Sequence, residues 1–320
     1  MFLYYTTFLC PCQVIPLAKN ICLCYNIPMN ERSEQLKNCK LCPLECGANR
    51  TKGVGACGAS GISIAKYYLH PFEEPCISFK NGSGTIFFTG CNLRCPYCQN
   101  FEVSRAIRGK AISTNELCDI FRELEDKGAE NISLVTPSHI VPYLCEALSS
   151  YRPKIPVVYN TSAYEKVDTL ALIDEFVDIY LPDLKFYSPA LSKRYLGRED
   201  YFDVASQAIR FMAKKPLKMT SEGKMLSGLI VRHLVMPLCS ADSKSIVKWV
   251  ARELGANTYL SLMSQYTPFG EIDKFPELGR KITAREYQSV VQTAMEMGME
   301  NLFLQERSSA QTAYVPKWDF

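Results

Sequence analysis

Residues 85–100 have the sequence TIFFTGCNLRCPYCQN, which determines the fold and carries the first chemical signal. The apolar run over 85–88 is typical of a strand. Three cysteines follow it in the spacing C-x3-C-x2-C, at Cys91, Cys95 and Cys98. Three thiolates on one short loop can hold three corners of a [4Fe–4S] cube, which usually takes four cysteines. The spacing therefore predicts a cluster with one open iron; buried thiols and a zinc knuckle are the alternatives.

Beyond this loop, strand-like and helix-like segments alternate along the chain. Apolar runs that predict strands lie at residues 85–89, 131–136, 156–161, 177–183, 229–236 and 258–264, and each is followed by a helix-like segment. Capping boxes at residues 113–116 and 283–286 predict the starts of two helices. Because parallel neighbours need a crossover connection, six such units predict an α/β fold with a parallel sheet, a partial (βα)6 TIM-like barrel. A doubly wound open sheet is the competing architecture.

Several polar residues fall at or just past the ends of the predicted strands. They are Cys91, Thr136, Asn160, Asp183 and Gln265. In parallel α/β sheets and barrels, ligands bind at the carboxyl ends of the strands. We therefore expect these residues to meet at one rim and to form a single active site.

A second group of cysteines lies upstream, at Cys39, Cys42, Cys46 and Cys57, with glycines at positions 53, 55 and 58. Four cysteines in so short a stretch can fold around a tetrahedral metal without much other structure. Zinc held by four thiolates is the simplest occupant, and an auxiliary iron–sulfur cluster has the same number of ligands. Free thiols on a loop are the alternative. The surrounding segment, 29–80, has little periodicity, and we expect it to be a loop-rich N-terminal module.

The first 28 residues differ in composition from the rest. They are apolar, have the single charge Lys19, and are interrupted by Pro11 and Pro16. The leader lacks the positively charged N-terminal region of a signal peptide, and its prolines interrupt the apolar run. Both features argue against a signal peptide and against a membrane-spanning helix. We interpret this leader as a translated upstream stretch with Met29 as the start; metal binding by its Cys-Pro-Cys and Cys-Leu-Cys pairs is the alternative. The barrel is then expected over 81–305, with a short tail over 306–320.

Composition excludes several classes of function. The chain of 320 residues is 47% hydrophobic and 22% charged, and its net charge of +3 is too small to indicate a nucleic-acid partner. Fifteen cysteines in a chain of this length, clustered at ligand-like spacings, favour metal ligation in a reducing compartment over disulfides. We therefore expect a cytoplasmic protein that binds neither nucleic acid nor membrane.

Several motifs together resemble one known family. The loop FFTGCNLRCPYCQN is followed by VTPSH (135–139), YNTS (159–162), LPDLK (181–185) and RHLVMP (232–237). With these motifs, residues 82–305 resemble the radical SAM superfamily, and within it the group similar to pyruvate formate-lyase activating enzyme. The resemblance extends upstream to Cys39. It implies a barrel of the radical SAM type, in which the open iron takes the amino and carboxylate groups of S-adenosylmethionine (SAM).

The resemblance also implies which side chains contact SAM. Tyr97, directly before the last cysteine of the loop, would pack on the adenine. Thr136 and Ser138 stand where activating enzymes have a Gly-Gly-Glu triplet that binds the SAM amino group, so a hydroxyl would replace the missing carboxylate. A strand exit followed by a helix N-cap is the alternative. Asn160 and Ser162 would contact polar groups of SAM, with an ordinary turn as the alternative.

Charged contacts are implied by two further motifs. Asp183 and Lys185 lie on the same face of a strand because side chains alternate. The carboxylate would serve the ribose or amino group of SAM and the ammonium its carboxylate; an ion pair at a strand end is the alternative. Arg232 matches a family strand whose arginine faces the SAM carboxylate, which a guanidinium can bind bidentately. His233 then faces the other way and is expected to be structural.

The resemblance implies a radical SAM iron–sulfur enzyme that reductively cleaves SAM to a 5′-deoxyadenosyl radical. The radical would abstract hydrogen from a glycine backbone of a partner enzyme, although peptide modification and small-molecule rearrangement use the same machinery. A flavodoxin or ferredoxin is the implied electron donor. The rival interpretation is a non-catalytic metal-binding protein in which both cysteine groups are structural.

Overall fold

The computed structural model describes residues 35–105, 108–305 and 318. The predictions for the leader over 1–28, and for the tail apart from residue 318, lie outside the described residues. Within the described chain, no helix is both long enough and apolar enough to cross a membrane.

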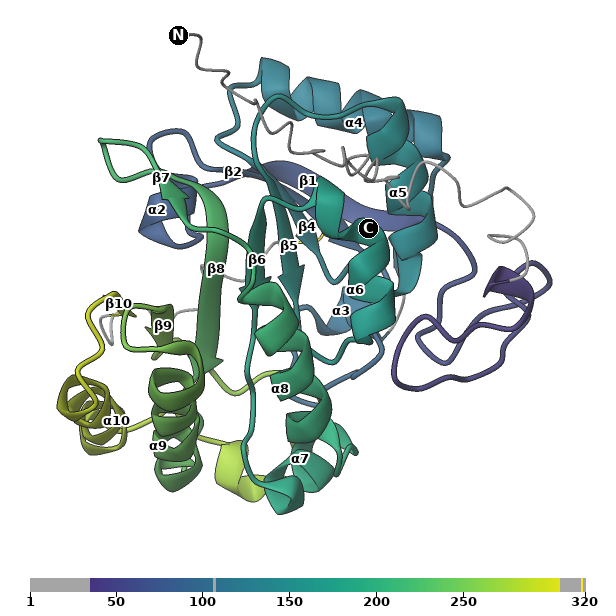
Figure 1. The fold of residues 1–320 in the computed structure, drawn as a ribbon. Helices are drawn as coiled ribbons and strands as arrows, with labels where there is room; N and C mark the ends of the chain where they lie inside the picture. The colour runs from purple at the N-terminus through teal and green to yellow at the C-terminus, as the bar shows by residue number, and fades with distance from the viewer. Residues whose placement is uncertain (1–34, 106–107, 306–317, 319–320) are drawn as a thin grey trace, which may run out of the picture.

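One large sheet forms the centre of the molecule (Figure 1). Its strands follow the order β10-β9-β8-β6-β5-β4-β2-β1-β3, and β7 pairs with β8. Neighbours from β2 to β10 are parallel, whereas β1 is antiparallel to β2, β3 to β1 and β7 to β8. The strands are β1 (Ser63–His70), β2 (Ser83–Phe88), β3 (Lys110–Ala111), β4 (Ile132–Val135), β5 (Val157–Thr161), β6 (Ile179–Pro182), β7 (Lys218–Met219), β8 (Met225–Leu234), β9 (Tyr259–Met263) and β10 (Leu302–Leu304).

Helices connect successive parallel strands. They are α2 (Pro75–Ser78), α3 (Phe101–Ser104), α4 (Thr114–Asp126), α5 (Val141–Ser150), α6 (Val167–Ile173), α7 (Pro189–Leu196), α8 (Tyr201–Met212), α9 (Ser240–Trp249) and α10 (Ala284–Glu296). Short 3-10 turns lie at Ser138–Ile140, Asp174–Phe176 and Pro276–Leu278, and a π-helical turn at Val250–Leu254 extends α9. Both predicted capping boxes are confirmed, at the starts of α4 and α10.

The strand order decides between the two predicted architectures. The parallel strands follow one another in chain order without a reversal, whereas a doubly wound sheet reverses its order at a switch point. Because crossover connections are right-handed, an order without reversal places the helices on one side of the sheet. In Figure 1 the helices follow the outside of a curved sheet, and neighbouring helices pack on one another. The edge strands β10 and β3 do not pair, so the sheet is a partial barrel, as predicted.

All six predicted strands are present, and the sheet contains strands that the sequence did not predict. The strand β1, SIAKYYLH, lies inside the expected loop-rich module and extends the sheet next to β2. It is mostly half-buried and mixes Lys66 with tyrosines, so it lacks the apolar run typical of a central strand. The strand β10 has only three residues at the sheet edge, too few for a periodic signal. The boundaries of the module stay a prediction.

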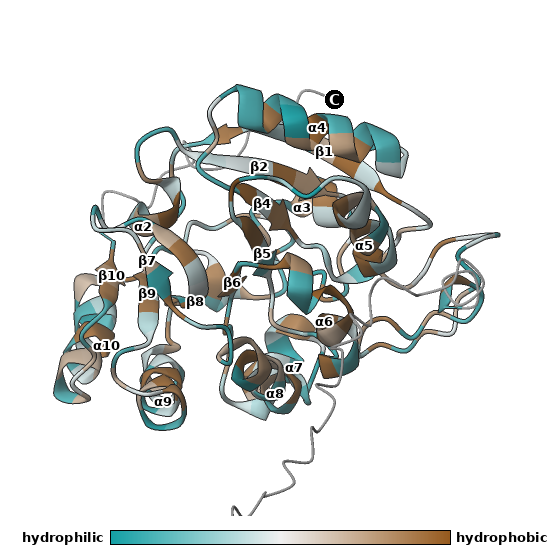
Figure 2. Cartoon of the chain, turned by 45° about the horizontal axis from the view of Figure 1, so that its top comes forward, coloured by the Kyte–Doolittle hydropathy of each residue, from teal (hydrophilic) through white to brown (hydrophobic). Residues whose placement is uncertain are grey.

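Apolar side chains fill the inside of the barrel at one end. Val158, Ile179, Leu181 and Ile230 are fully buried and cluster with Ile77 of α2. Neighbouring positions on the same strands point the other way, into the larger core beneath the helices. In Figure 2, hydrophobic residues lie along the central strands and hydrophilic ones on the outer side of α4.

Two residues further along the same strands, the inward positions become polar. They are Asn160 on β5, Asp183 just after β6 and Arg232 on β8. Residues i and i+2 of a strand share a face, so each polar residue lies directly beyond an apolar member of the inner cluster. The inside of the barrel therefore has two layers: an apolar floor, and above it a polar layer at the carboxyl ends of the strands.

We expect the Leu181→Ala variant to be destabilised by about 2–5 kcal/mol, because it opens a cavity in this fully buried floor. The matched control is Leu226→Ala, at a leucine of β8 that is 39% exposed. The control should stay within about 0.5 kcal/mol of the parent protein. Urea unfolding of both variants measures the difference, and equal losses would contradict the two-layer interior.

Candidate active site

A cavity of about 250 Å³ opens at the carboxyl ends of the parallel strands. The five strand-end residues expected to meet, Cys91, Thr136, Asn160, Asp183 and Gln265, all line it. The expectation of one shared rim is therefore confirmed. Six further predicted site residues also line this cavity: Cys95, Tyr97, Cys98, Ser162, Lys185 and Arg232.

The cysteine loop turns back towards the cavity immediately after β2. Gly90 has φ +88°, and a Cβ at this position would lie 2.8 Å from the Cys57 carbonyl oxygen, so only glycine fits. The backbone N–H of Leu93 donates to Cys91 Sγ at 3.4 Å, and the hydroxyl of Ser104 donates to Cys98 Sγ at 3.4 Å. These donors suit sulfur atoms that carry negative charge.

The surroundings of the three thiols fit a bound iron–sulfur cluster. Burial raises the pKa of Cys95 to about 12, an effect that nearby Lys185 opposes and the Cys91 and Cys98 thiols reinforce. The three cysteines and Lys185 all line the same cavity. No group of three or more His, Cys, Asp or Glu side chains in the described chain is arranged to hold a single metal ion. A four-iron cube, however, separates its ligands more widely than one ion does.

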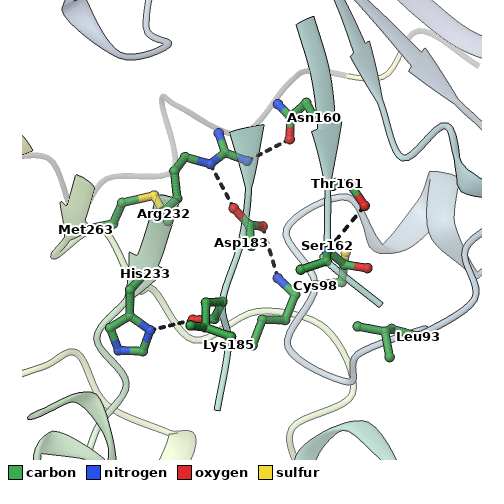
Figure 3. A network of polar contacts seen from close by, with 12 residues as sticks. Leu93, Cys98, Asn160, Thr161, Ser162, Asp183, Lys185, Arg232, His233 and Met263 are labelled. Atoms are coloured by element: carbon green, nitrogen blue, oxygen red, sulfur yellow. Dashed lines mark hydrogen bonds and ion pairs between the residues drawn. The ribbon is translucent and has the colours of Figure 1, made fainter. Parts of the chain in front are cut away.

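A network of partly buried charges forms one wall of the cavity (Figure 3). Asp183 accepts from Arg232 Nε at 2.8 Å and from Lys185 Nζ at 3.0 Å. Arg232 also donates from Nη2 to Asn160 at 2.7 Å and from Nη1 to Glu73 at 3.1 Å. Each nitrogen of the guanidinium therefore has a protein partner, whereas Lys185 contacts one carboxylate.

The charges in this network stabilise one another. Burial alone would raise the pKa of Asp183, but Arg232 and Lys185 outweigh it and hold that pKa below its usual value. For Glu73, burial is the larger effect and raises the pKa, although Arg232 opposes it. Burial likewise raises the pKa of Glu74, to about 7. The network therefore holds an ionised Asp183 between two cations.

Glu73 was missed by the sequence analysis. It lies in the segment between β1 and α2, outside every predicted strand, and reaches Arg232 across 159 positions of the chain. The sequence signal is two adjacent acidic residues before Pro75, a pattern that is common on protein surfaces. Only the folded chain shows that Glu73 is buried and lines the cavity.

Ser138 is not brought to the cavity. Thr136 has φ +59°, unusual for a β-branched residue, and the chain then enters the 3-10 turn Ser138–Ile140. The turn directs the Ser138 hydroxyl to Glu165, which also accepts from Thr161. The prediction that Ser138 contacts the ligand finds no support in this geometry, whereas Thr136 does line the cavity.

Ser162 and Tyr97 are placed as a ligand pocket requires. The Ser162 hydroxyl is buried on the cavity wall and has no hydrogen-bond partner in the described chain. Tyr97 is 7% exposed, and its ring makes edge contacts with Phe186 and Tyr266, which fix its orientation. The expected structural role of His233 agrees with its contacts: it lies buried between the Leu184 carbonyl and the Ser243 hydroxyl.

The four upstream cysteines lie close together on the side of the barrel next to the cysteine loop. Cys39, Cys42 and Cys57 are buried, and Cys46 is exposed. Burial raises the pKa of Cys42 to about 12, and the nearby Cys57 and Cys39 thiols add to the effect. All eleven cysteines of the described chain are free thiols.

Comparison with known proteins identifies a family domain in this part of the chain. Residues 85–229 match the family model of the Radical SAM superfamily. An uncharacterized protein of Methanocaldococcus jannaschii is 28% identical over 279 residues, which covers 83% of this chain and 77% of that protein.

Solved structures with similar folds include two proteins of different size. SuiB of Streptococcus suis, bound to the precursor peptide SuiA, matches with a TM-score of 0.48 and 14% identity, over 68% of this chain and 46% of that chain. A domain of pyruvate-formate lyase-activating enzyme from Bacteroides vulgatus matches with a TM-score of 0.37 and 11% identity, over 60% of this chain and 91% of the domain. The chain thus spans less than half the length of SuiB.

We expect the Glu165→Gln variant to change how stability depends on pH. Burial raises the pKa of Glu165 from 4.5 to about 7, so its stabilising contribution is complete below pH 4.5 and is lost as the pH rises through 7. The variant, which has no charge to bury, should gain stability relative to the parent between pH 5 and pH 8. Urea unfolding across this range measures it.

The control for this prediction is Glu222→Gln, at a side chain that is 65% exposed. Its stability relative to the parent should stay flat over the same range. A difference between the Glu165 variant and the parent that does not change with pH would show that this carboxyl is ionised throughout.

Proposed function

We propose that this protein is an enzyme that cleaves SAM reductively, with a [4Fe–4S] cluster on Cys91, Cys95 and Cys98. The match of residues 85–229 to the Radical SAM family model supports this proposal. One observation carries the proposal: the three cysteines of one loop and the partly buried charge network line the same cavity. When bound, the cluster supplies the electron that splits the sulfonium bond of SAM and releases a 5′-deoxyadenosyl radical.

Lys185 is the best-placed cation for the SAM carboxylate. It lines the same cavity as the three cysteines, and its ammonium lies near the Cys95 thiol. Asp183 keeps this ammonium charged and fixes its position, and Arg232 in turn fixes Asp183. Since every nitrogen of Arg232 already has a protein partner, we assign Arg232 a supporting role in place of the direct carboxylate contact that the resemblance implies.

The remaining predicted residues would bind the rest of SAM. The unpartnered hydroxyl of Ser162 and the amide of Asn160 suit its amino and ribose groups, and Thr136 lies on the same wall. Tyr97 offers a fixed, buried ring to the adenine. Enclosing the ligand in this way excludes water, which protects a reactive radical.

By resemblance to the activating enzymes, the substrate would be a glycine backbone in a partner protein or peptide, and a flavodoxin or ferredoxin would deliver the electron. The free thiols of the described chain suit a reducing compartment such as the cytoplasm. The four upstream cysteines, Cys39, Cys42, Cys46 and Cys57, would bind zinc or a second iron–sulfur cluster.

The triple variant Cys91→Ala, Cys95→Ala, Cys98→Ala should produce no 5′-deoxyadenosine from SAM under anaerobic, reducing conditions. The parent protein, reconstituted with iron and sulfide, should be brown, carry about four irons at this site and produce 5′-deoxyadenosine. Chromatography of the reaction mixture measures the product. A parent that binds the cluster but never cleaves SAM would support the rival, a non-catalytic metal-binding protein.

Lys185→Ala should weaken SAM binding by about ten- to a hundredfold while the cluster stays in place, because a charge-assisted hydrogen bond to the carboxylate is lost. Arg232→Ala should weaken it too, since Asp183 and Glu73 would lose their shared cation. The change of the cluster's EPR signal on SAM titration reports binding. Lys193→Ala, at a side chain that is 68% exposed, is the control. If the SAM titration curves of Lys185→Ala and Arg232→Ala both match that of the parent, these residues form an ordinary ion pair at a strand end and do not bind SAM.

A further inference from the structure

The N-terminal module buries an arginine that lacks an acidic partner. Arg50 is 3% exposed and donates to the carbonyl oxygens of Ala59 and His139. Its Nη1 lies 3.9 Å from Cys39 Sγ, and its Nη2 is buried without any partner. No ion pair with a carboxylate of the described chain neutralises it. Because a buried charge is costly without an opposite charge, Arg50 indicates an anion that the protein residues alone do not supply.

The four upstream cysteines supply that anion when they bind a metal. As neutral thiols they carry no charge, whereas four thiolates around a divalent ion, or around an iron–sulfur cube, carry a net negative charge. The charge of Arg50 thus favours a metal centre over free thiols.

The space between the cysteines agrees with this assignment. A Cβ added at Gly55 would lie 3.3 Å from Cys57 Sγ and 3.7 Å from Cys46 Sγ, so a side chain there would fill the gap between two ligands. The same point lies 3.7 Å from Arg50 Cδ. Gly55 has no positive φ, so the reason for glycine at this position is space.

This group of cysteines lies directly behind the loop of the candidate active site. The backbone N–H of Cys91 donates to the Cys57 carbonyl at 3.1 Å, so a ligand of one site holds a ligand of the other. Arg50 binds the His139 carbonyl, and the His139 ring binds the Thr89 carbonyl, at the end of β2, at 2.8 Å. The cysteine loop is therefore held from behind by two connections. One begins at Cys57 and the other at Arg50, which lies beside Cys39.

We propose that Cys39, Cys42, Cys46 and Cys57 bind a metal as an anionic thiolate centre, that Arg50 is its counter-charge, and that its occupancy positions the loop carrying Cys91, Cys95 and Cys98. The centre takes a thiophilic metal. Because no group of three or more His, Cys, Asp or Glu side chains in the described chain is arranged around a single ion, zinc would require the four sulfurs to move closer together, whereas an iron–sulfur cluster holds its ligands further apart. This inference deepens the proposed upstream centre, and it is independent of whether SAM is cleaved.

The first experiment measures metal in the triple variant Cys91→Ala, Cys95→Ala, Cys98→Ala, purified anaerobically without chelator. Elemental analysis should find about one zinc or about four irons per chain, and the two results distinguish the occupants. Adding Cys46→Ala, at the exposed cysteine, should remove this metal, whereas adding Cys118→Ala, at a buried cysteine of α4, should not. A metal-free triple variant would overturn the proposal.

The second experiment tests Arg50 in the same triple-variant background. Arg50→Met keeps most of the stem but loses the charge, and metal release to a chelator should become about ten- to a hundredfold faster. Arg50→Lys, which restores the charge, should recover part of this loss even if Arg50→Met folds poorly. Arg122→Met, at an exposed arginine of α4, is the control. Release at the parent rate in Arg50→Met would refute the counter-charge role.

The third experiment tests the connection between the two sites in the otherwise native chain. The Cys46→Ala variant should take up at least about threefold less iron at Cys91, Cys95 and Cys98 on reconstitution, with a weaker EPR signal, whereas Cys118→Ala should match the parent. Normal uptake in a Cys46→Ala protein that lacks the upstream metal would refute the positioning role. Full metal loading of both sites without SAM cleavage would instead refute the proposed enzyme activity and leave this inference standing.

Discussion

The ion pair between Asp183 and Arg232 is the interaction on which the site depends. These two residues form a parallel bridge just beyond the end of β6, where the Leu184 N–H donates to the Arg232 carbonyl at 2.8 Å. Backbone pairing brings the two side chains together, and the ion pair in turn holds β6 and β8 side by side at the rim. Removing Arg232 would leave Asp183 with Lys185 as its remaining ionic partner, and removing Asp183 would leave Arg232 with Glu73.

The same ion pair determines which of the neighbouring cations has donors left for a ligand. Arg232 is occupied by Asp183, Glu73 and Asn160, so it is a rigid part of the wall. Lys185 contacts the same carboxylate with one of its three donors and keeps its charge in a buried setting, because Asp183 and Cys95 outweigh the effect of burial on its pKa. All the nitrogens of Arg232 have protein partners, whereas Lys185 uses one of its donors. Arg232 therefore supports the wall of the site, and Lys185 is available to bind a ligand.

The strands and the rim could be predicted from sequence because both follow from short-range periodicity. Apolar runs mark the central strands, and alternation then places Asn160, Asp183 and Arg232 on the inner face. Glu73 and Arg50 could not be predicted, because each is defined by burial against residues that are distant in the chain. Ser138 failed for a local reason: the positive φ of Thr136 starts a turn that directs the serine hydroxyl to Glu165.

The contact between the N-terminal module and the barrel is made largely by backbone carbonyl oxygens. Those of Cys57, His139 and Leu41 accept from Cys91, Arg50 and Thr169. A carbonyl acceptor depends on the path of the main chain and not on the identity of its side chain. A module of little regular structure can keep that path only if something within it fixes the chain, and the proposed metal centre on four cysteines would do so with few residues. This contact therefore requires particular residue types only at the cysteines, Arg50 and Gly55. The exposed positions between them can be occupied by other residue types.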